Sequence, residues 1–365
     1  MLPVNLHEYE EAARERLAEP AYAYVAGGAG DEVTLRGNRE AFGRWRLLPR
    51  VMRGASRTSA ATTVLGHEVS FPVLLAPVGM HRLVHPDGEL ASARAAARLG
   101  TIFTLSTMST YSIEEVGAVA RDWWFQLYVQ RDREVTRDLV RRAEAAGAAA
   151  LVVTLDTQVL GRREADERNR FAMPADLPLA NFTGGRSEMR ENAGGSAIAA
   201  YTGARFEPDL SWEDLDWLAG LTPLPVVAKG ILAPDDARLA TEHGARAVIV
   251  SNHGGRQLDS AVATLDALPA VARAVEDRAE VLLDGGVRRG TDVLKALALG
   301  ARAVMLGRPY IFGLAADGEA GVVRVLELLR AEVANAMALA GCPTVTDIDQ
   351  ALVVPPGPLV PAPVV

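Results

Sequence analysis

Cysteine is almost absent from this sequence of 365 residues, because Cys342 is the only one. A single cysteine can form neither an intrachain disulfide nor a cysteine-based metal cluster, and this usage is typical of a reducing cytoplasm. Histidine does not replace it as a metal ligand, since the pair His81 and His85 lacks an intervening Glu and Pro86 interrupts any helix there. We therefore expect a cytoplasmic protein without a bound metal.

The sequence also lacks an excess of basic residues and any long hydrophobic run. Its formal net charge of −8 at pH 7 argues against a nucleic-acid partner, because phosphate backbones are bound mainly through clustered Lys and Arg. No stretch approaches the roughly 18 uninterrupted apolar residues that span a bilayer. Residues 1–20 carry five Glu and two Arg, so they predict an amphipathic helix rather than a secretory signal. A membrane partner is not expected.

From residue 70 onward, short β-branched and aliphatic runs alternate with segments of helical period. The helical segments include 88–99, 133–146, 234–243, 265–275 and 290–299, several of them followed by Gly as a C-cap signal. Eight apolar runs can be counted, at 73–76, 102–105, 124–127, 151–155, 226–228, 247–250, 281–283 and 303–306. This pattern predicts a (β/α)8 TIM barrel.

A doubly wound open sheet is the alternative fold. It would place a glycine-rich phosphate turn directly after its first strand, but residues 73–76 continue into Pro77-Val78-Gly79. The glycine-rich segment 26–30 follows a helical stretch, 12–25, rather than a strand. It therefore predicts a helix stop and not a dinucleotide loop.

One domain is expected to cover residues 1–365, because α/β barrels routinely exceed about 250 residues. We assign an N-terminal helical extension to 1–69, the barrel to 70–345 and a tail to 346–365. Between the fourth and fifth strands lies a long insertion, 174–208. Its centre from Phe182 to Arg205 is rich in Gly, Ser, Asn and Ala and predicts a mobile lid.

Polar residues follow nearly every predicted strand, where barrels of this kind build their active sites. These residues are Ser106, Gln126, Tyr128, Thr154, Asp156, Lys229, Ser251, His253, Arg256, Asp284, Arg288 and Arg308. A single such residue is more often a solvated or capping side chain. The convergence of many on one rim favours a site.

The turns after the last two strands, Asp284-Gly285-Gly286-Val287-Arg288 and Leu306-Gly307-Arg308, predict a phosphate site. Glycine lets the backbone approach a phosphate closely, and the two arginines can supply bidentate charge. The strongest candidate base is His253, because imidazole titrates near neutrality. A carboxylate such as Asp156 could fix its tautomer.

The segment Ser251-Asn252-His253-Gly254-Gly255-Arg256-Gln257-Leu258-Asp259 resembles the active-site signature of the FMN-dependent (S)-2-hydroxy acid oxidases and dehydrogenases. This family includes glycolate oxidase, lactate oxidase and mandelate dehydrogenase. The resemblance extends from Tyr24 to Arg308 and beyond, in order and at family spacing. It implies an (S)-2-hydroxy acid substrate, L-lactate or larger, an FMN cofactor, oxygen as acceptor with hydrogen peroxide as product, and a homotetramer or homo-octamer.

The resemblance also implies roles for single residues. His253 would be the base with Asp156 as its partner, Arg163 and Arg256 would bind the substrate carboxylate, and Tyr24 and Tyr128 would contact the carboxylate and hydroxyl. The flavin ring and ribityl chain would contact Pro77, Val78, Gly79, Ser106, Gln126, Thr154, Lys229 and Ser251, and the ribityl chain and phosphate would contact Asp284, Gly286, Arg288, Gly307 and Arg308.

Two positions depart from the glycolate oxidase pattern. Gly79 replaces the Ala of many oxidases, and Met108 replaces a Trp, which puts glycolate in doubt and favours a larger substrate. The residues leave open a dehydrogenase that passes electrons to a quinone or another carrier. A non-catalytic FMN-binding barrel and a sugar-phosphate isomerase also remain open, because fold alone does not fix function.

Overall fold

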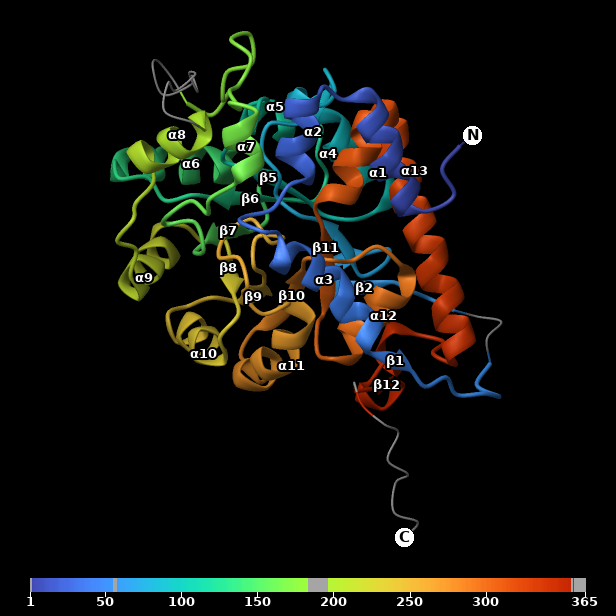
Figure 1. Ribbon diagram of the computed structural model, residues 1–365. Helices are drawn as coiled ribbons and strands as arrows, with labels where there is room; N and C mark the ends of the chain where they lie inside the picture. The colour runs from blue at the N-terminus through green and yellow to red at the C-terminus, as the bar shows by residue number, and fades with distance from the viewer. Residues whose placement is uncertain (1, 55–57, 183–195, 356, 358–365) are drawn as a thin grey trace.

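Eight parallel strands close into a barrel at the centre of the protein, as the alternating pattern predicted (Figure 1). The computed structural model describes all residues except 1, 55–57, 183–195, 356 and 358–365. Around the barrel the strands follow the order β10-β11-β4-β5-β6-β7-β8-β9. They are β4 (Val73–Leu75), β5 (Phe103–Ser106), β6 (Trp123–Leu127), β7 (Leu151–Thr154), β8 (Val226–Ile231), β9 (Ala247–Val250), β10 (Glu280–Asp284) and β11 (Ala303–Leu306).

The strands are mostly apolar because both of their faces are buried, and most of their polar residues lie toward the carboxyl ends. Alternate residues such as Leu74, Trp124 and Leu282 point into the barrel, and their neighbours pack against the outer helices. A hairpin of β2 (Thr62–Val64) and β3 (His67–Val69) adds Val64 and Val69 to the inner cluster. The interior is therefore a packed core that leaves the carboxyl ends of the strands free to form a site.

Helices surround the barrel between successive strands (Figure 1). Their observed ends lie within one residue of the predicted ones, and the predicted glycine cap of α4 is observed, since Gly100 has a φ of 63°. They are α4 (Gly88–Leu99), α5 (Ile113–Gly117), α6 (Arg133–Ala145), α9 (Trp212–Leu221), α10 (Pro234–Glu242), α11 (Thr264–Val275) and α12 (Gly290–Ala298), with 3-10 turns η1 (His81–Leu83), η3 (Val345–Asp347) and η4 (Gln350–Leu352).

The N-terminal residues form α1 (Leu6–Arg16), α2 (Glu19–Ala26) and α3 (Val33–Arg44). The single helical stretch expected at 12–25 is wrong, because Leu17 ends α1 in an extended conformation and Pro20 lies in the first turn of α2. The helix stop expected at 26–30 is confirmed, since α2 ends at Ala26. Farther along the chain, β1 (Arg46–Leu47) pairs with β12 (Val353–Val354) and joins this extension to the C-terminal tail.

Between β7 and the predicted insertion 174–208 lies α7 (Glu164–Arg168), and the insertion itself contains a second helix, α8 (Ala197–Arg205). The second helix occupies part of the segment predicted as a lid, and its Ile198, Tyr201 and Thr202 are buried. Alanine-rich residues that were interpreted as loop are good helix formers once one face of the helix can pack. Residues 183–195 of the predicted lid lie outside the described residues, and lid motion stays a prediction.

The last helix, α13 (Arg308–Ala340), is two helices joined at a kink, because Asp317 and Gly318 have non-helical backbone angles. The two parts cross at Gly313 and Gly321, where a Cβ added to Gly321 would lie only 1.9 Å from the carbonyl oxygen of Gly313. Its first residue, Arg308, follows β11 after Gly307 and lines the predicted site. Among the described helices, none is long and apolar enough to cross a membrane.

The crossing inside α13 predicts that Gly321→Ala destabilises the fold. The added methyl would force the two helices apart, and such overpacking costs about 1–3 kcal/mol of unfolding free energy. Gly220→Ala in α9 is the control, because a Cβ there meets nothing within 4 Å; it should stabilise by up to about 1 kcal/mol. Denaturant unfolding of both variants measures the difference, and equal midpoints would contradict the close crossing.

Candidate active site

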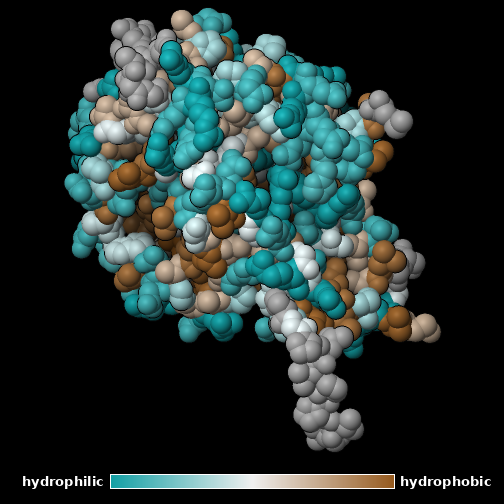
Figure 2. Space-filling model, viewed as in Figure 1, coloured by the Kyte–Doolittle hydropathy of each residue, from teal (hydrophilic) through white to brown (hydrophobic). Residues whose placement is uncertain are grey.

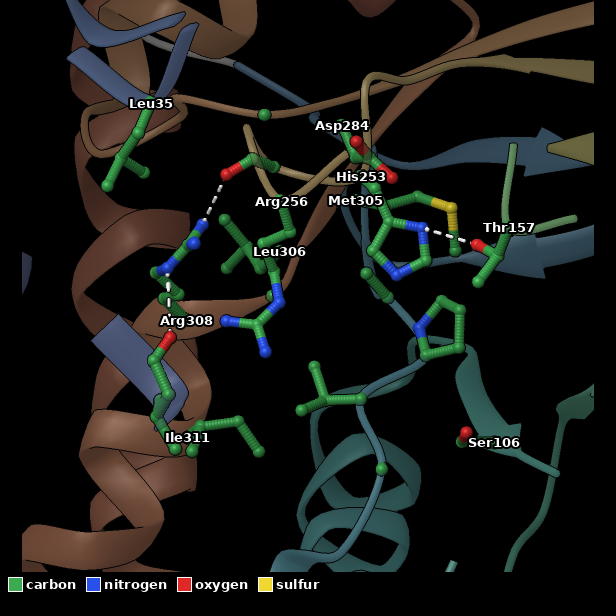
Figure 3. A pocket seen from close by; sticks show the side chains of 18 of the residues that line it. Leu35, Ser106, Thr157, His253, Arg256, Asp284, Met305, Leu306, Arg308 and Ile311 are labelled. Carbon is green, nitrogen blue, oxygen red and sulfur yellow. Dashed lines mark hydrogen bonds between the residues drawn. The ribbon is translucent and has the colours of Figure 1, made fainter. Parts of the chain in front are cut away.

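A cavity at the carboxyl ends of the barrel strands contains most of the residues that the sequence singled out (Figure 3). The predicted residues that line it are Tyr24, Pro77, Val78, Gly79, Ser106, Met108, Tyr128, Arg163, Lys229, His253, Arg256, Asp284, Gly286, Arg288, Gly307 and Arg308. The four other predicted residues lie behind this wall and hydrogen-bond to it or to one another; they are Gln126, Thr154, Asp156 and Ser251.

The turn after β9 carries His253 in a left-handed backbone conformation. The φ angles of His253, Gly254 and Gly255 are 58°, 65° and 75°. Glycine adopts such angles freely, whereas a residue with a side chain loses about 1–2 kcal/mol. His253 Nδ1 lies 3.0 Å from Asp156 Oδ1 and 3.3 Å from the hydroxyl of Thr157. The contact between His253 and Thr157 is one of the dashed lines in Figure 3.

The environment keeps His253 neutral and Asp156 ionised. Burial lowers the pKa of His253 below its usual 6.5, although the nearby Asp156 opposes this shift. Burial works against the charge of Asp156, but His253 and Lys229 outweigh it and lower the pKa of the carboxyl. An ionised carboxylate can only accept, so the hydrogen of His253 is on Nδ1. The lone pair of Nε2 is therefore available to a ligand.

Two arginines and two tyrosines stand near His253. Arg163 is only 7% exposed, and burial together with the charge of Arg256 lowers its pKa to about 10, so it stays cationic at neutral pH. The guanidinium of Arg256 lies 4.9 Å from the ring centre of Tyr24 and donates to the backbone oxygens of Tyr24 and Gly27. Burial raises the pKa of Tyr128, which remains a hydrogen-bond donor.

Two further arginines line the far part of the cavity, beside the glycine turn after β10. Gly285 and Gly286 have φ angles of 93° and 94°. Burial lowers the pKa of Arg288 to about 10. Arg308 donates to backbone oxygens at the end of α2 and to Gly254, and burial and Arg256 hold its pKa well below the usual value. Among the described residues, no carboxylate forms an ion pair with either arginine.

Lys229 lines the cavity and contacts residues at the ends of two neighbouring strands. The prediction that it follows a strand is wrong, because β8 continues to Ile231 through an irregularity at Gly230. Its Nζ lies 3.3 Å from Asp284 Oδ2 and donates to Ser251 Oγ at 3.0 Å. Burial disfavours its charge, but Asp284 and Asp156 outweigh burial and raise the pKa of Lys229. A buried cation therefore stays beside the cavity.

Several lining residues were not predicted. Ile198, Thr202 and Phe206 come from the insertion, and Leu35 and Asn38 come from α3. Thr157 could have been found from its place next to Asp156. The others stand on helices or, for Phe206, directly after one, in sequences that carry no motif, so only the folded chain reveals them.

Histidine paired with a carboxylate, clustered arginines and glycine turns at the last strands are features of an active site in a barrel enzyme that binds small anions. The chain belongs to the FMN-dependent dehydrogenase family, whose family model matches residues 13–355.

Known relatives span nearly the whole chain. An L-lactate oxidase from Nostoc sp. is 51% identical over 95% of this chain and 97% of its own length. The 2-hydroxyacid oxidase 1 of Homo sapiens is 50% identical over 97% of both chains. A crystal structure of mandelate oxidase with (S)-4-hydroxymandelic acid superposes with a TM-score of 0.93 at 46% identity and covers 96% of this chain and 98% of that one.

The geometry of the histidine pair predicts that Asp156→Asn lowers the pKa of His253 further. The carboxylate favours the charged imidazolium, so its loss favours the neutral ring. Nitrogen-15 NMR of the histidine rings measures the pKa, with the His253 signal assigned by its loss in His253→Gln. Thr157→Val is the control, since it removes a contact to the same nitrogen without removing a charge, and it should shift the pKa less. An unchanged or raised pKa in Asp156→Asn would refute the pairing.

Proposed function

We propose that this protein oxidises an (S)-2-hydroxy acid, L-lactate or a larger one, to the 2-oxo acid, with FMN as cofactor and oxygen reduced to hydrogen peroxide. The observation that carries the proposal is the placement of a neutral histidine with a free Nε2 in the same cavity as Arg163 and Arg256. Oxidation of an alcohol beside a carboxylate needs both a base and an anion site.

Each residue has a role that its contacts support. Arg163 and Arg256 bind the substrate carboxylate, and the hydroxyls of Tyr24 and Tyr128 contact the carboxylate and the substrate hydroxyl. His253 accepts the departing proton at Nε2. Asp156 holds the ring through Nδ1 and stabilises the imidazolium that forms.

Two buried polar atoms beside the cavity lack hydrogen-bond partners among the described residues, and FMN carries groups that could supply them. Arg288 Nε and Asp284 Oδ1 are buried without a hydrogen-bond partner in the described part of the chain. A phosphate supplies the acceptor that an arginine lacks, and ribityl hydroxyls supply donors for the carboxylate. A Cβ at Gly286 would lie 2.2 Å from the backbone oxygen of Asn38, so only glycine fits this turn. When bound, FMN accepts the two electrons that leave the substrate.

Residues in and behind the cavity wall would make the other contacts with FMN. The positive charge of Lys229 would stabilise the reduced, anionic form of the flavin. The flavin ring and ribityl chain would also be held by Pro77, Val78, Gly79 and Ser106, with Gln126, Thr154 and Ser251 behind them, and the phosphate end by Gly307 and Arg308.

Oxygen is the proposed acceptor because the lactate and 2-hydroxyacid relatives carry the name oxidase. The purified protein should be yellow and should bleach with L-lactate or (S)-mandelate but not with the mirror-image acids. Mixing the reduced protein with air-saturated buffer should restore the colour rapidly. Slow reoxidation would favour a dehydrogenase, and a colourless protein that takes up no FMN would refute the proposal.

Cytoplasmic location and a homotetramer or homo-octamer are part of the same proposal. The single cysteine supports a reducing compartment. Exposed apolar residues beside the site loops, Val159 and Leu258, support association, and Figure 2 shows apolar side chains gathered on part of the viewed face. Light scattering of the purified protein tests the oligomer, and a monomer would contradict it.

The base assignment predicts that His253→Gln keeps the yellow colour and loses bleaching. Loss of a general base lowers a rate by about a hundredfold to ten thousandfold. His243→Gln is the matched control, because His243 also pairs with a carboxylate, Asp216 at 2.7 Å, but stands outside the cavity. Stopped-flow absorbance measures flavin reduction in both. A wild-type rate in His253→Gln would refute the assignment.

The side-chain pocket predicts that Gly79→Ala discriminates against large substrates. A Cβ at Gly79 would lie 3.0 Å from Met108 Cβ and 3.1 Å from its carbonyl oxygen, so the Met108 wall must move. One methyl in such a pocket changes specificity by about tenfold to two-hundredfold. We expect kcat/KM to fall more for (S)-mandelate than for L-lactate, which serves as the internal control. An equal fall for both acids would contradict a role in size selection.

A further inference from the structure

We propose that Asn38, on α3 of the N-terminal extension, is a positioning residue for His253 and acts through Asn252. The inference rests on the proposed function, because it takes His253 as the base. Asn38 lies 214 residues from Asn252 along the chain. Its contribution comes from a helix that is not part of the barrel.

The two asparagine side chains form a reciprocal hydrogen-bonded pair. Asn38 Nδ2 donates to Asn252 Oδ1, and Asn252 Nδ2 donates to Asn38 Oδ1, both at 2.8 Å. The residues are only 2% and 5% exposed. A buried amide without hydrogen-bond partners is unfavourable, so each side chain depends on the other. Bonds to the backbone of Val262, Gly255 and Thr264 fix which end of each amide is the oxygen.

The pair is tied directly to the turn that carries His253. Asn252 Oδ1 also accepts from the backbone N–H of Gly255 at 3.0 Å. One oxygen therefore joins Asn38 to both ends of the turn, from the residue before His253 to the second residue after it. A second set of bonds anchors the pair, since Asn252 Nδ2 donates to the oxygen of Val262 and Asn38 Oδ1 accepts from the N–H of Thr264.

The turn needs such support because His253 has a φ of 58°. A residue with a side chain is disfavoured in this conformation, and the two glycines that follow impose no restraint of their own. Without Asn38, Asn252 loses one acceptor and one donor and can rotate. The ring of His253 would then move relative to Asp156, and a misplacement near 1 Å costs about a hundredfold in rate.

Substrate binding depends on other contacts. Arg256 is held by the backbone oxygens of Tyr24 and Gly27, and Arg163 donates to the backbone oxygen of Arg256. Loss of Asn38 should therefore slow proton transfer to His253 more than it weakens binding of the hydroxy acid.

The first test is Asn38→Ala in the full chain loaded with FMN. Stopped-flow flavin reduction with L-lactate or (S)-mandelate should show a limiting rate lower by about tenfold to a hundredfold, with an unchanged substrate dissociation constant. Thr34→Val is the matched control, because Thr34 stands on the same helix and its hydroxyl contacts the same loop farther along, at the oxygens of Leu258 and Ala261. An unchanged limiting rate, an equal loss in the control, or a loss confined to substrate binding would overturn the proposal.

Hydrogen exchange gives a second test that does not need turnover. In the FMN-loaded protein, amides of residues 251–257 should exchange faster in Asn38→Ala than in the wild type, and Thr34→Val should leave them unchanged. If no hydroxy acid reduces the wild type, the proposed function fails. The exchange measurement would still test whether the Asn38–Asn252 pair holds the turn. Unchanged exchange in Asn38→Ala would overturn the inference even in an active enzyme.

A double variant tests whether Asn38 acts through Asn252. Asn252→Ala already removes the bond to Gly255 as well as the pair, so adding Asn38→Ala should lower the limiting rate no further. Multiplied losses in the double variant would show that the two asparagines act separately and would overturn the proposed route.

Discussion

The confinement in one cavity of four arginines that lack a carboxylate partner in the described chain is the constraint on which the rest of the site depends. Arg163, Arg256, Arg288 and Arg308 all line it, and burial together with neighbouring arginines lowers the pKa of Arg163 and Arg308. The fifth arginine of the lining, Arg39, pairs with Glu10. No carboxylate among the described residues forms an ion pair with any of the four. Neutral backbone oxygens hold Arg256 and Arg308 instead, at the carboxyl end of α2, where the helix dipole favours positive charge. The cavity therefore keeps its positive charge for anions, although the chain as a whole is acidic.

That arrangement makes the N-terminal extension part of the site. Without α2 the arginines at the mouth of the barrel would lose their backbone acceptors, and without α3 the turn after β9 would lose Asn38. Leu35 and Asn38 also line the cavity themselves. A (β/α)8 barrel supplies the side chains at its strand ends, but here the helices that precede it orient them. The extension and barrel thus act as one unit.

The barrel and most of the cavity wall could be predicted from the sequence, because both depend on patterns within short segments of the chain. Fully buried strands are apolar runs, and residues at their ends meet on one rim whatever the loops between them do. The details that could not be predicted depend on contacts between distant segments. Asn38 meets Asn252, and β8 bends at Gly230, where a Cβ would lie 2.6 Å from that of Asp156. Likewise, α8 was interpreted as loop because its alanines gain a packing partner only in the fold.

The same dependence on distant contacts sets the backbone positions around Gly79, where we propose that substrate size is selected. The N–H of Met80 donates to the oxygen of Met108 at 3.0 Å, which ties the loop after β4 to the loop after β5. Beneath them the buried Glu89 accepts from the backbone N–H groups of His81 and Thr110. Because these bonds hold both loops at once, they restrain the Met108 backbone against a larger side chain at position 79, whose Cβ would lie 3.1 Å from the Met108 carbonyl oxygen. The space between Gly79 and Met108 is therefore set by the contacts between the two loops.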